Sequence, residues 1–248
     1  MTDSDDLVHG LHAVQAALAR TDSTIRAVWV ERDRRDQRMA EVLAACADRG
    51  LQVQRVDRRE LDRLSGGAAH QGVVIDCPPM PAGDEASLDQ LLDVLQAEPF
   101  LLVLDQVQDP HNLGACLRTA DAAGVQAVIT TRDRAASLTP VVHKVASGAT
   151  RSVPFIQVTN LARTLERLRK RGIWLVGAAG DAPITMDAVD LTGPLAVVMG
   201  AEGSGLRRLT REHCDHLAKI PMAGTVESLN VSVATGVMLF EAVRQRQI

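Results

Sequence analysis

Aromatic side chains are scarce in this chain of 248 residues, which has no Tyr, two Trp and three Phe. A surface that reads single-stranded nucleic acid by stacking its bases needs several exposed aromatic rings. The composition therefore disfavours a protein that recognises its partner by base stacking.

Long apolar runs and a signal-peptide pattern are also absent. No stretch of eighteen apolar residues occurs, the length typical of a membrane-spanning helix, and residues 1–6 are mostly polar. We therefore expect a soluble, cytoplasmic protein with no membrane partner. With 46% hydrophobic residues, the chain is long enough for one large or two small domains.

Cysteine is sparse and scattered. The four cysteines, at positions 46, 77, 116 and 214, form no C-x-x-C pair, so we expect reduced packing residues rather than a disulfide framework or a zinc site. The run His213-Cys214-Asp215-His216 has metal-capable side chains, but consecutive positions point in different directions. We therefore expect no metal site.

Lysine is rare, since all 27 basic residues except Lys144, Lys170 and Lys219 are Arg. Arginine suits phosphate recognition, although a genome rich in G and C would give the same bias. The net charge of −4 argues against strong nonspecific binding to nucleic acid. Arginine clusters at residues 32–35 and 55–59 leave two interpretations open: a solvated mixed-charge surface, or a surface that contacts RNA phosphates.

The order of the expected elements indicates two α/β units. In the first, helical stretches near 11–18, 39–48 and 58–64 alternate with strands at 25–30, 51–56 and 72–76. Prolines at positions 78, 79 and 81 then break the pattern. We assign residues 1–77 to an N-terminal domain, and residues 78–98 to a proline-containing linker with a short helix at 88–96.

The second unit, residues 99–248, indicates a parallel sheet covered on both faces. Apolar runs at 100–104, 125–130, 153–158, 173–178 and 195–199 alternate with helical stretches at 113–123, 141–147, 161–171 and 206–212. A last helix is expected at 231–246. In such sheets ligands bind beyond the carboxyl ends of the strands.

Two segments of this unit have the form of ligand loops. The strand at 195–199 runs into Gly200, Gly203 and Gly205 with one carboxylate, Glu202, and residues 220–233 repeat this design. Glycine permits a sharp turn or a close approach of the backbone to a ligand. The G-x-x-G-x-G spacing is neither a dinucleotide fingerprint nor a P-loop, which disfavours an enzyme that binds another adenine nucleotide there.

A third polar segment follows the strand at 100–104. The pair Asp109-Pro110 predicts a helix start, which places Asn112 in the first turn and Arg118 close to two turns later. Because Arg118 lies among apolar residues, we interpret it as a charge on a buried face. Such a charge must either pair with an acid, here Asp105 or Glu202, or face a ligand cleft.

Together these segments resemble the three signature motifs of the SpoU/TrmH family of RNA 2′-O-ribose methyltransferases. The motifs are D-x-x-x-D-P-x-N-x-G-x-x-x-R-T-A from residue 105, M-G-x-E-G-x-G from residue 199 and I-P-M-x-G-x-x-x-S-L-N-V-x-V-A from residue 220. Residues 8–14 and 70–74 resemble in particular the branch that methylates a guanosine in the peptidyl-transferase region of 23S ribosomal RNA. The resemblance spans essentially the whole chain.

The resemblance implies a fold and partners that the pattern of apolar residues does not indicate. The catalytic domain would contain a deep trefoil knot of the SPOUT type, and the first domain would resemble the L30e and L7Ae proteins and contact RNA. The enzyme would work as a homodimer, with residues of both subunits at each site. S-adenosylmethionine would bind backbone groups of Gly200, Ile220 and Leu229.

The resemblance also implies roles for the polar residues. Methyl transfer to a ribose depends on positioning the 2′-hydroxyl and managing its proton. Arg118 would orient the nucleotide and stabilise developing negative charge, because a guanidinium is a poor base. The polar shell around it would be Asn112, Glu202, Ser228 and Asn230. Two alternatives remain: the same chemistry on transfer RNA, and a non-catalytic RNA-binding protein, which the intact motifs disfavour.

Overall fold

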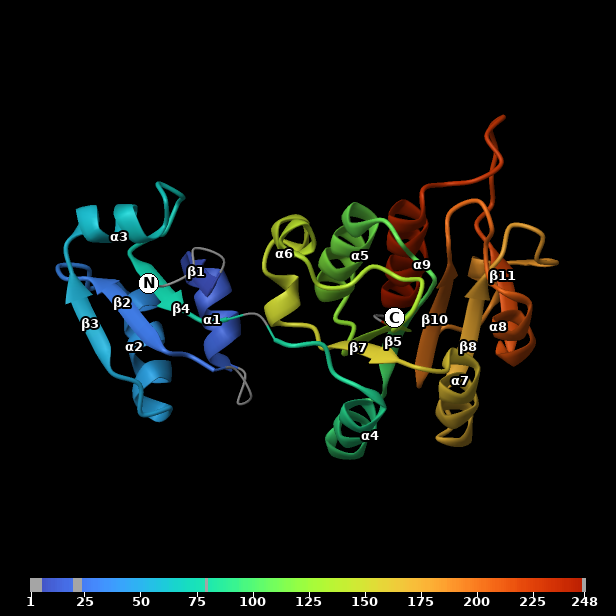
Figure 1. Ribbon diagram of the computed structural model, residues 1–248, viewed down its shortest axis with the longest axis horizontal. Helices are drawn as coiled ribbons and strands as arrows, with labels where there is room; N and C mark the ends of the chain where they lie inside the picture. Colours follow the sequence, from blue (N-terminus) through green and yellow to red (C-terminus); the bar gives the residue numbers. More distant parts are fainter. Residues whose placement is uncertain (1–5, 20–23, 79, 247–248) are drawn as a thin grey trace. The chain divides into compact units, whose positions relative to one another are not determined.

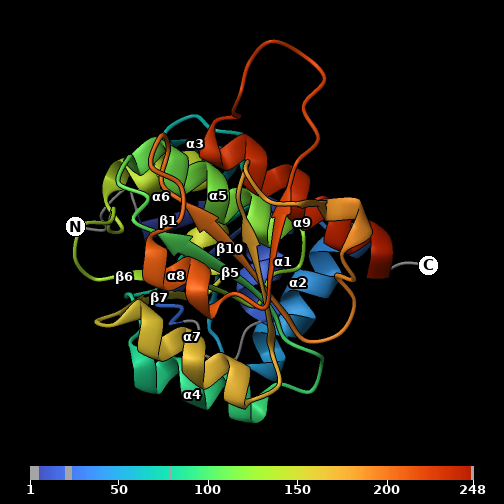
Figure 2. The same cartoon turned by 90° about the vertical axis from the view of Figure 1, so that its right-hand side faces the viewer.

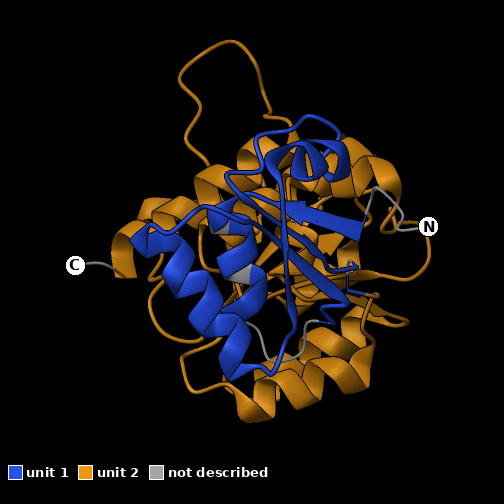
Figure 3. Ribbon diagram, turned by 90° about the vertical axis from the view of Figure 1, so that its left-hand side faces the viewer, with its two compact units in different colours: residues 1–80 blue, residues 81–248 orange. Residues whose placement is uncertain are grey.

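The computed structural model describes residues 6–19, 24–78 and 80–246 (Figure 1). The chain consists of two compact units, residues 1–80 and residues 81–248 (Figure 3). The first five residues of the expected N-terminal domain and Pro79 of the expected linker lie outside the described residues. The linker bounds stay a prediction, and the helix expected there, α4 (Glu85–Val94), contacts β7 of the second unit.

The first unit contains a four-stranded sheet in the order β1 (Leu7–His9), β4 (Val73–Asp76), β2 (Ala27–Glu31), β3 (Val53–Val56). Strand β4 is antiparallel to both β1 and β2, whereas β2 and β3 are parallel. The sequence analysis missed β1, because three residues are too few to display alternation. The other three strands were predicted to within two residues at each end.

Aspartate caps define where two helices of this unit begin. Helix α2 (Gln37–Asp48) follows Asp36, whose carboxylate accepts from the backbone N of Met39 at 3.2 Å. Helix α3 (Arg58–Leu64) follows Asp57, which accepts from the backbone N of Glu60 at 2.9 Å. Helix α2 and helix α1 (Leu11–Ala19) supply residues of a core that includes the fully buried Val28, Met39, Val42 and Ile75.

The second unit contains a seven-stranded sheet in which every neighbouring pair is parallel. Its order is β7 (Phe155–Val158), β6 (Ala127–Thr131), β5 (Phe100–Asp105), β10 (Leu195–Gly200), β8 (Trp174–Ala178), β11 (His216–Lys219), β9 (Ile184–Thr185). All six residues of β5 are buried, as expected for a strand that is covered on both sides.

Helices cover both faces of this sheet, which confirms the predicted α/β architecture. Helices α5 (Pro110–Ala122), α6 (Pro140–Ala146) and α9 (Val231–Arg246) lie on one face, and α4 and α7 (Leu161–Lys170) lie on the other (Figures 1 and 2). Alternate residues of β5 supply the two cores: Leu102 and Leu104 pack in the first, Leu101 and Val103 in the second. Helix α8 (Arg208–His213) contacts α7, and two short 3-10 helices lie at Ala149–Arg151 and Met186–Ala188.

The sequence analysis missed two strands at one edge of this sheet, β9 and β11. Strand β11 has only two apolar residues, Leu217 and Ala218, which are too few to indicate a strand from the sequence. Its position is nevertheless decisive for the site. Because β11 is parallel to β8, it delivers Ile220 to the same edge of the sheet as Gly200.

One glycine permits the close contact between α5 and α6. Gly114 is buried in α5, and a Cβ atom there would lie 2.7 Å from Cβ of Val145 and 3.0 Å from the carbonyl O of Val142. Backbone and a β-branched side chain cannot move aside easily. The two helices therefore approach as closely as they do because position 114 has no side chain.

We expect Gly114→Ala to destabilise the second unit by about 1–3 kcal/mol through overpacking. Without the clash, alanine in a helix interior would stabilise it by roughly 0.5–1 kcal/mol. Urea unfolding followed by circular dichroism measures the difference. The matched control is Gly236→Ala in α9, where a Cβ would meet only Cγ2 of Thr119 at 3.6 Å, and where we expect no loss. Wild-type stability of Gly114→Ala would contradict the proposed packing constraint.

Candidate active site

The carboxyl ends of β8, β10 and β11 surround a cavity of about 420 Å³. The loops that follow these strands and the first turn of α9 supply its walls. Lining residues are 178–180, 199–203, 205, 218, 220, 222, 227–229, 231 and 234. The cavity therefore lies where open parallel sheets bind their ligands, and it is large enough for a nucleoside-sized molecule.

The glycine loop after β10 folds back tightly onto its own strand. A Cβ atom at Gly200 would lie 2.1 Å from the backbone C of Gly205, so only glycine fits at position 200. The backbone N of Gly205 donates to the carbonyl O of Ala201 at 2.9 Å, and Gly203 and Gly205 both have positive φ. The loop consequently lines the cavity with three glycines, Ala201 and one polar side chain, that of Glu202.

A buried carboxylate fastens the far end of this loop to the neighbouring strand. Asp105, at the end of β5, is fully buried and accepts from the backbone N of Arg207 at 3.0 Å and from its Nε at 2.6 Å. A buried carboxylate is costly unless it is paired in this way. The pair therefore holds the polypeptide that leaves the glycine loop against the end of β5.

The start of α5 is held as the sequence predicts. Asp109 caps the helix by accepting from the backbone N of His111 at 3.2 Å and of Asn112 at 3.1 Å, and Pro110 occupies the first turn. This cap places the Asn112 side chain at the edge of the sheet where the glycine loop emerges.

Three of the predicted polar residues form one hydrogen-bonded chain, although they are far apart in sequence. Nδ2 of Asn230 donates to Oδ1 of Asn112 at 2.9 Å, and Nδ2 of Asn112 donates to Oε2 of Glu202 at 3.3 Å. Oδ1 of Asn230 accepts from the backbone N of Ser232 at 2.9 Å, in the first turn of α9. The chain thus joins the three motifs at one place.

Of the other predicted site residues, all except Arg118 line the cavity. Gly200, Ile220, Ser228 and Leu229 all line the cavity, and Ser228 is exposed. Arg118 does not line it.

The expectation that Arg118 is a charge on a buried face is wrong. Its side chain is exposed, and it has no ion pair or hydrogen bond with the residues that the structure describes. Leu117 points into the core, but one step along a helix rotates the next side chain by about 100° toward solvent. The two proposed acid partners are engaged elsewhere: Asp105 pairs with Arg207 and Glu202 accepts from Asn112.

The two cysteines of this region are neutral packing residues. Burial raises the pKa of Cys116 to about 11, even though its thiol lies 3.5 Å from Oγ1 of Thr235. Burial, followed by the charges of Asp215 and Asp105, raises the pKa of Cys214 to about 12. Neither thiol is available as a nucleophile at neutral pH, because the thiolate is the reactive form.

The run from His213 to His216 has four separate environments. Nδ1 of His213 lies 2.8 Å from the carbonyl O of Leu209, and the ring of His216 stacks on Trp174. Asp215 pairs with Arg169.

Across residues 6–19, 24–78 and 80–246, no three His, Cys, Asp or Glu side chains converge in the manner of a metal site. None of the helices in these residues has the length and apolarity that a bilayer crossing requires.

Sequence reasoning missed one wall of the cavity, the loop at residues 178–180 after β8. This loop reads Ala178-Ala179-Gly180 and has no polar side chain, so nothing in its composition suggests a binding role. The only available signal was its position at the carboxyl end of a predicted parallel strand. Met199 and Met222, which also line the cavity, were not predicted either.

Family models match both units. The model of the SpoU rRNA Methylase family matches residues 99–240, and the model described as RNA 2′-O ribose methyltransferase substrate binding matches residues 7–81. A curated relative from Pseudomonas putida, named 23S rRNA (guanosine-2′-O-)-methyltransferase RlmB, is 55% identical over 241 residues, which are 97% of each chain. A relative of the same name from Escherichia coli is 53% identical over 97% of this chain and 99% of its own.

Solved structures agree with these matches. The SpoU methyltransferase AviRb from Streptomyces viridochromogenes, in complex with AdoMet, is 26% identical with a TM-score of 0.68, covering 96% of this chain and 89% of that one. A TrmH/SpoU tRNA modifying enzyme from A. aeolicus is 32% identical with a TM-score of 0.56, covering 66% and 84%. The resemblance inferred from the three motifs is confirmed: the chain belongs to the SpoU rRNA methylase family.

Proposed function

We propose that this protein transfers a methyl group from S-adenosylmethionine to the 2′-hydroxyl of a guanosine in 23S ribosomal RNA. The observation that carries the proposal is the hydrogen-bonded chain of Asn230, Asn112 and Glu202 beside the cavity that the glycine loop lines. The near full-length identity to relatives named 23S rRNA (guanosine-2′-O-)-methyltransferase supports both the chemistry and the RNA.

The cavity suits this cofactor. Gly200, Gly203 and Gly205 of the glycine loop line the cavity, and Ile220 and Leu229 add apolar contact for a purine. We propose that Gly200, Ile220 and Leu229 hold the cofactor, as the AdoMet-bound AviRb structure supports for the family. When bound, S-adenosylmethionine supplies an electrophilic methyl group on a sulfonium.

The polar residues then act on the ribose. With S-adenosylmethionine bound, a bond would form between O2′ and the methyl carbon as the bond from sulfur to that carbon breaks, while the hydroxyl proton passes to solvent. Arg118 stays protonated, so it orients the nucleotide and stabilises the developing negative charge on O2′. The shell of Asn112, Glu202, Ser228 and Asn230 positions the ribose and the methionine end of the cofactor.

In a homodimer, the exposed Arg118 of one copy could act at the site of the other copy. Helix α9, which packs against the Arg118 helix α5, exposes Val233 (51%) and Phe240 (48%) two turns apart on one side. An apolar stripe of this kind is typical of an interface. We propose that two copies pair through α9 and that each site uses residues of both copies.

Two further properties rest on the family resemblance. The trefoil knot is proposed for the segment that contains β10 and the residue 220–230 loop. The first unit is proposed to contact RNA with an L30e-like fold, which its match to a substrate-binding family model supports. Transfer RNA remains the second candidate substrate, because a tRNA modifying enzyme shares the fold over 66% of this chain.

The first test is transfer of tritiated methyl groups from S-adenosylmethionine to unmodified 23S RNA and, separately, to unmodified tRNA, followed by mapping of ribose-methylated positions. We expect label at one guanosine of 23S RNA, because the full-length relatives carry that name. Label on tRNA alone would keep the chemistry and overturn the substrate. Absence of label from both would favour a non-catalytic RNA-binding protein.

We expect Arg118→Lys to retain cofactor affinity and to lose most of its turnover, on the order of 100-fold, because an ammonium cannot reproduce a bidentate guanidinium. Isothermal titration measures binding, and single-turnover methylation measures the chemistry. Arg163→Lys, at an exposed position of α7, is the matched control and should behave as wild type. Near-normal turnover of Arg118→Lys would remove Arg118 from the mechanism.

We expect Asp105→Asn to weaken S-adenosylmethionine binding by about tenfold, since the charge-assisted bonds that hold the glycine loop are lost. The estimate is modest because the Arg207 side chain is 44% exposed. Titration calorimetry measures it. Asp93→Asn, which breaks a surface ion pair with Arg171, should bind normally. Equal affinity of the two variants would show that the Asp105 pair does not hold the loop in its binding conformation.

A further inference from the structure

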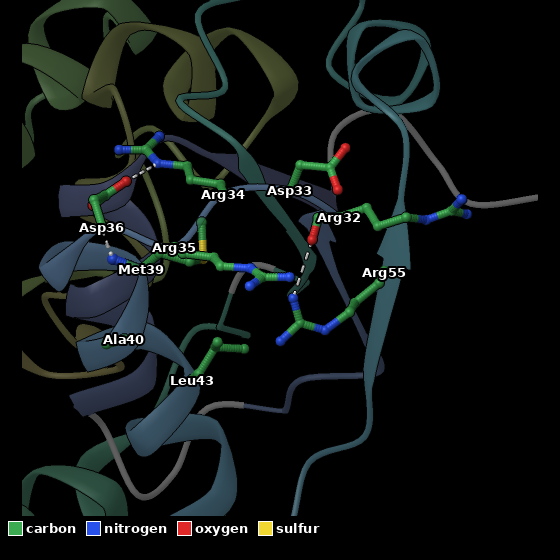
Figure 4. A pocket seen from close by; sticks show the side chains of 9 residues that line it. All are labelled: Arg32, Asp33, Arg34, Arg35, Asp36, Met39, Ala40, Leu43 and Arg55. Carbon is green, nitrogen blue, oxygen red and sulfur yellow. Dashed lines mark hydrogen bonds and ion pairs between the residues drawn. The ribbon is translucent and has the colours of Figure 1, made fainter.

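The first unit has a hollow of about 580 Å³ at the start of α2 (Figure 4). It lies between the connection from β2 to α2, one side of α2, and β3. Its lining residues are 32–36, Met39, Ala40, Leu43 and Arg55. Met39 is fully buried, whereas Ala40 is exposed and Leu43 half-buried, so Ala40 and Leu43 give the hollow an accessible apolar floor next to its charged side chains.

Two of the charged side chains neutralise each other and belong to the structure of the unit. Nε of Arg34 donates to the Asp36 carboxylate, and Nη1 of Arg34 donates to the carbonyl O of Gln71. The bond from Arg34 lowers the pKa of Asp36, which also caps α2. A Cβ at Gly72 would lie 2.8 Å from Cδ of Arg34. Arg34 therefore fastens the residue 71–72 turn and is not available to a ligand.

Arg35 and Arg55 remain available. Arg35 has no hydrogen bond or ion pair with the described residues, and Arg55 uses one N–H, donating from Nη1 to the carbonyl O of Arg32 at 3.3 Å. Figure 4 shows the two side chains entering the hollow from different elements, with their guanidinium groups at its centre, whereas the carboxylate of Asp33 points away from them. Two cations placed together without an acid between them favour an anion there.

The chemistry of this arrangement matches a nucleic acid backbone. Guanidinium groups bind phosphate oxygens in a bidentate manner, and an apolar floor can accept the carbon face of a ribose. None of the lining residues is aromatic, so the hollow has no ring on which a base could stack. This unit also matches a family model described as substrate binding for RNA 2′-O ribose methyltransferases.

We propose that Arg35 and Arg55 bind one phosphodiester of the RNA substrate and that the adjoining ribose lies on Ala40 and Leu43. This inference rests on the proposed function and adds the place and chemical form of one contact. A contact of this kind positions the RNA without selecting its sequence. It strengthens substrate binding and leaves the chemical step unchanged.

The test compares Arg35→Ala/Arg55→Ala with Arg38→Ala/Arg59→Ala. The control pair is on the same unit, is exposed, removes the same charge and does not line the hollow. Filter binding measures the affinity of each protein for unmodified 23S RNA between 50 and 300 mM KCl, a range in which phosphate contacts are strongly salt-dependent. Circular dichroism checks that both proteins are folded, and methylation is measured at saturating RNA.

We expect the Arg35/Arg55 variant to bind about tenfold more weakly than the control, with a log–log salt dependence shallower by about 1–2. Its S-adenosylmethionine affinity and its rate at saturating RNA should equal those of wild type. Equal RNA affinity of the two variants, with normal methylation by wild type, overturns this inference alone. Failure of wild type to bind or methylate 23S RNA overturns the proposed function and this inference with it.

Discussion

The burial of the Asp105 carboxylate at the end of β5 is the constraint on which the candidate site depends. A charge in that position needs a partner, and Arg207 supplies it from the far end of the glycine loop. Asp105 holds the loop at Arg207, and the loop folds back onto Gly200 at its start. The loop backbone therefore has few alternative conformations. Glu202 is thereby placed within reach of Asn112, and a side chain from each of the three motifs meets there.

The helices and strands that could be predicted are those whose own residues show a clear local pattern, such as a helix cap or a continuous apolar run. The bounds of α3 and α9 matched their predicted ranges, since an aspartate cap marks the start of α3 and the glycine loop region precedes α9. Strands β5 and β10 were evident from their continuous apolar residues. Strands β1, β9 and β11 were not, because they are short and become strands only by pairing with distant partners.

The site was predictable mainly through its motifs. The residues expected to hold a cofactor do surround one cavity, and three members of the polar shell do make contact. The pairing of Asp105 with Arg207 was not foreseen, because no local pattern links an aspartate to an arginine so far along the chain. The composition of residues 178–180 could not show that they line the cavity either, because this segment has no polar side chain.

The strand order has a consequence for how the protein is made. Strand β10 lies between β5 and β8, yet it is synthesised after every other strand of the sheet except β11. Until it emerges from the ribosome, β5, β6 and β7 can pair with one another, but β8 and β9 have no partner, because they pair only with β10 and β11. Pairings between segments so distant in sequence form slowly. The second unit therefore completes its sheet only after β10 and β11 have been made, while the first unit, whose described strands all precede residue 77, can fold early.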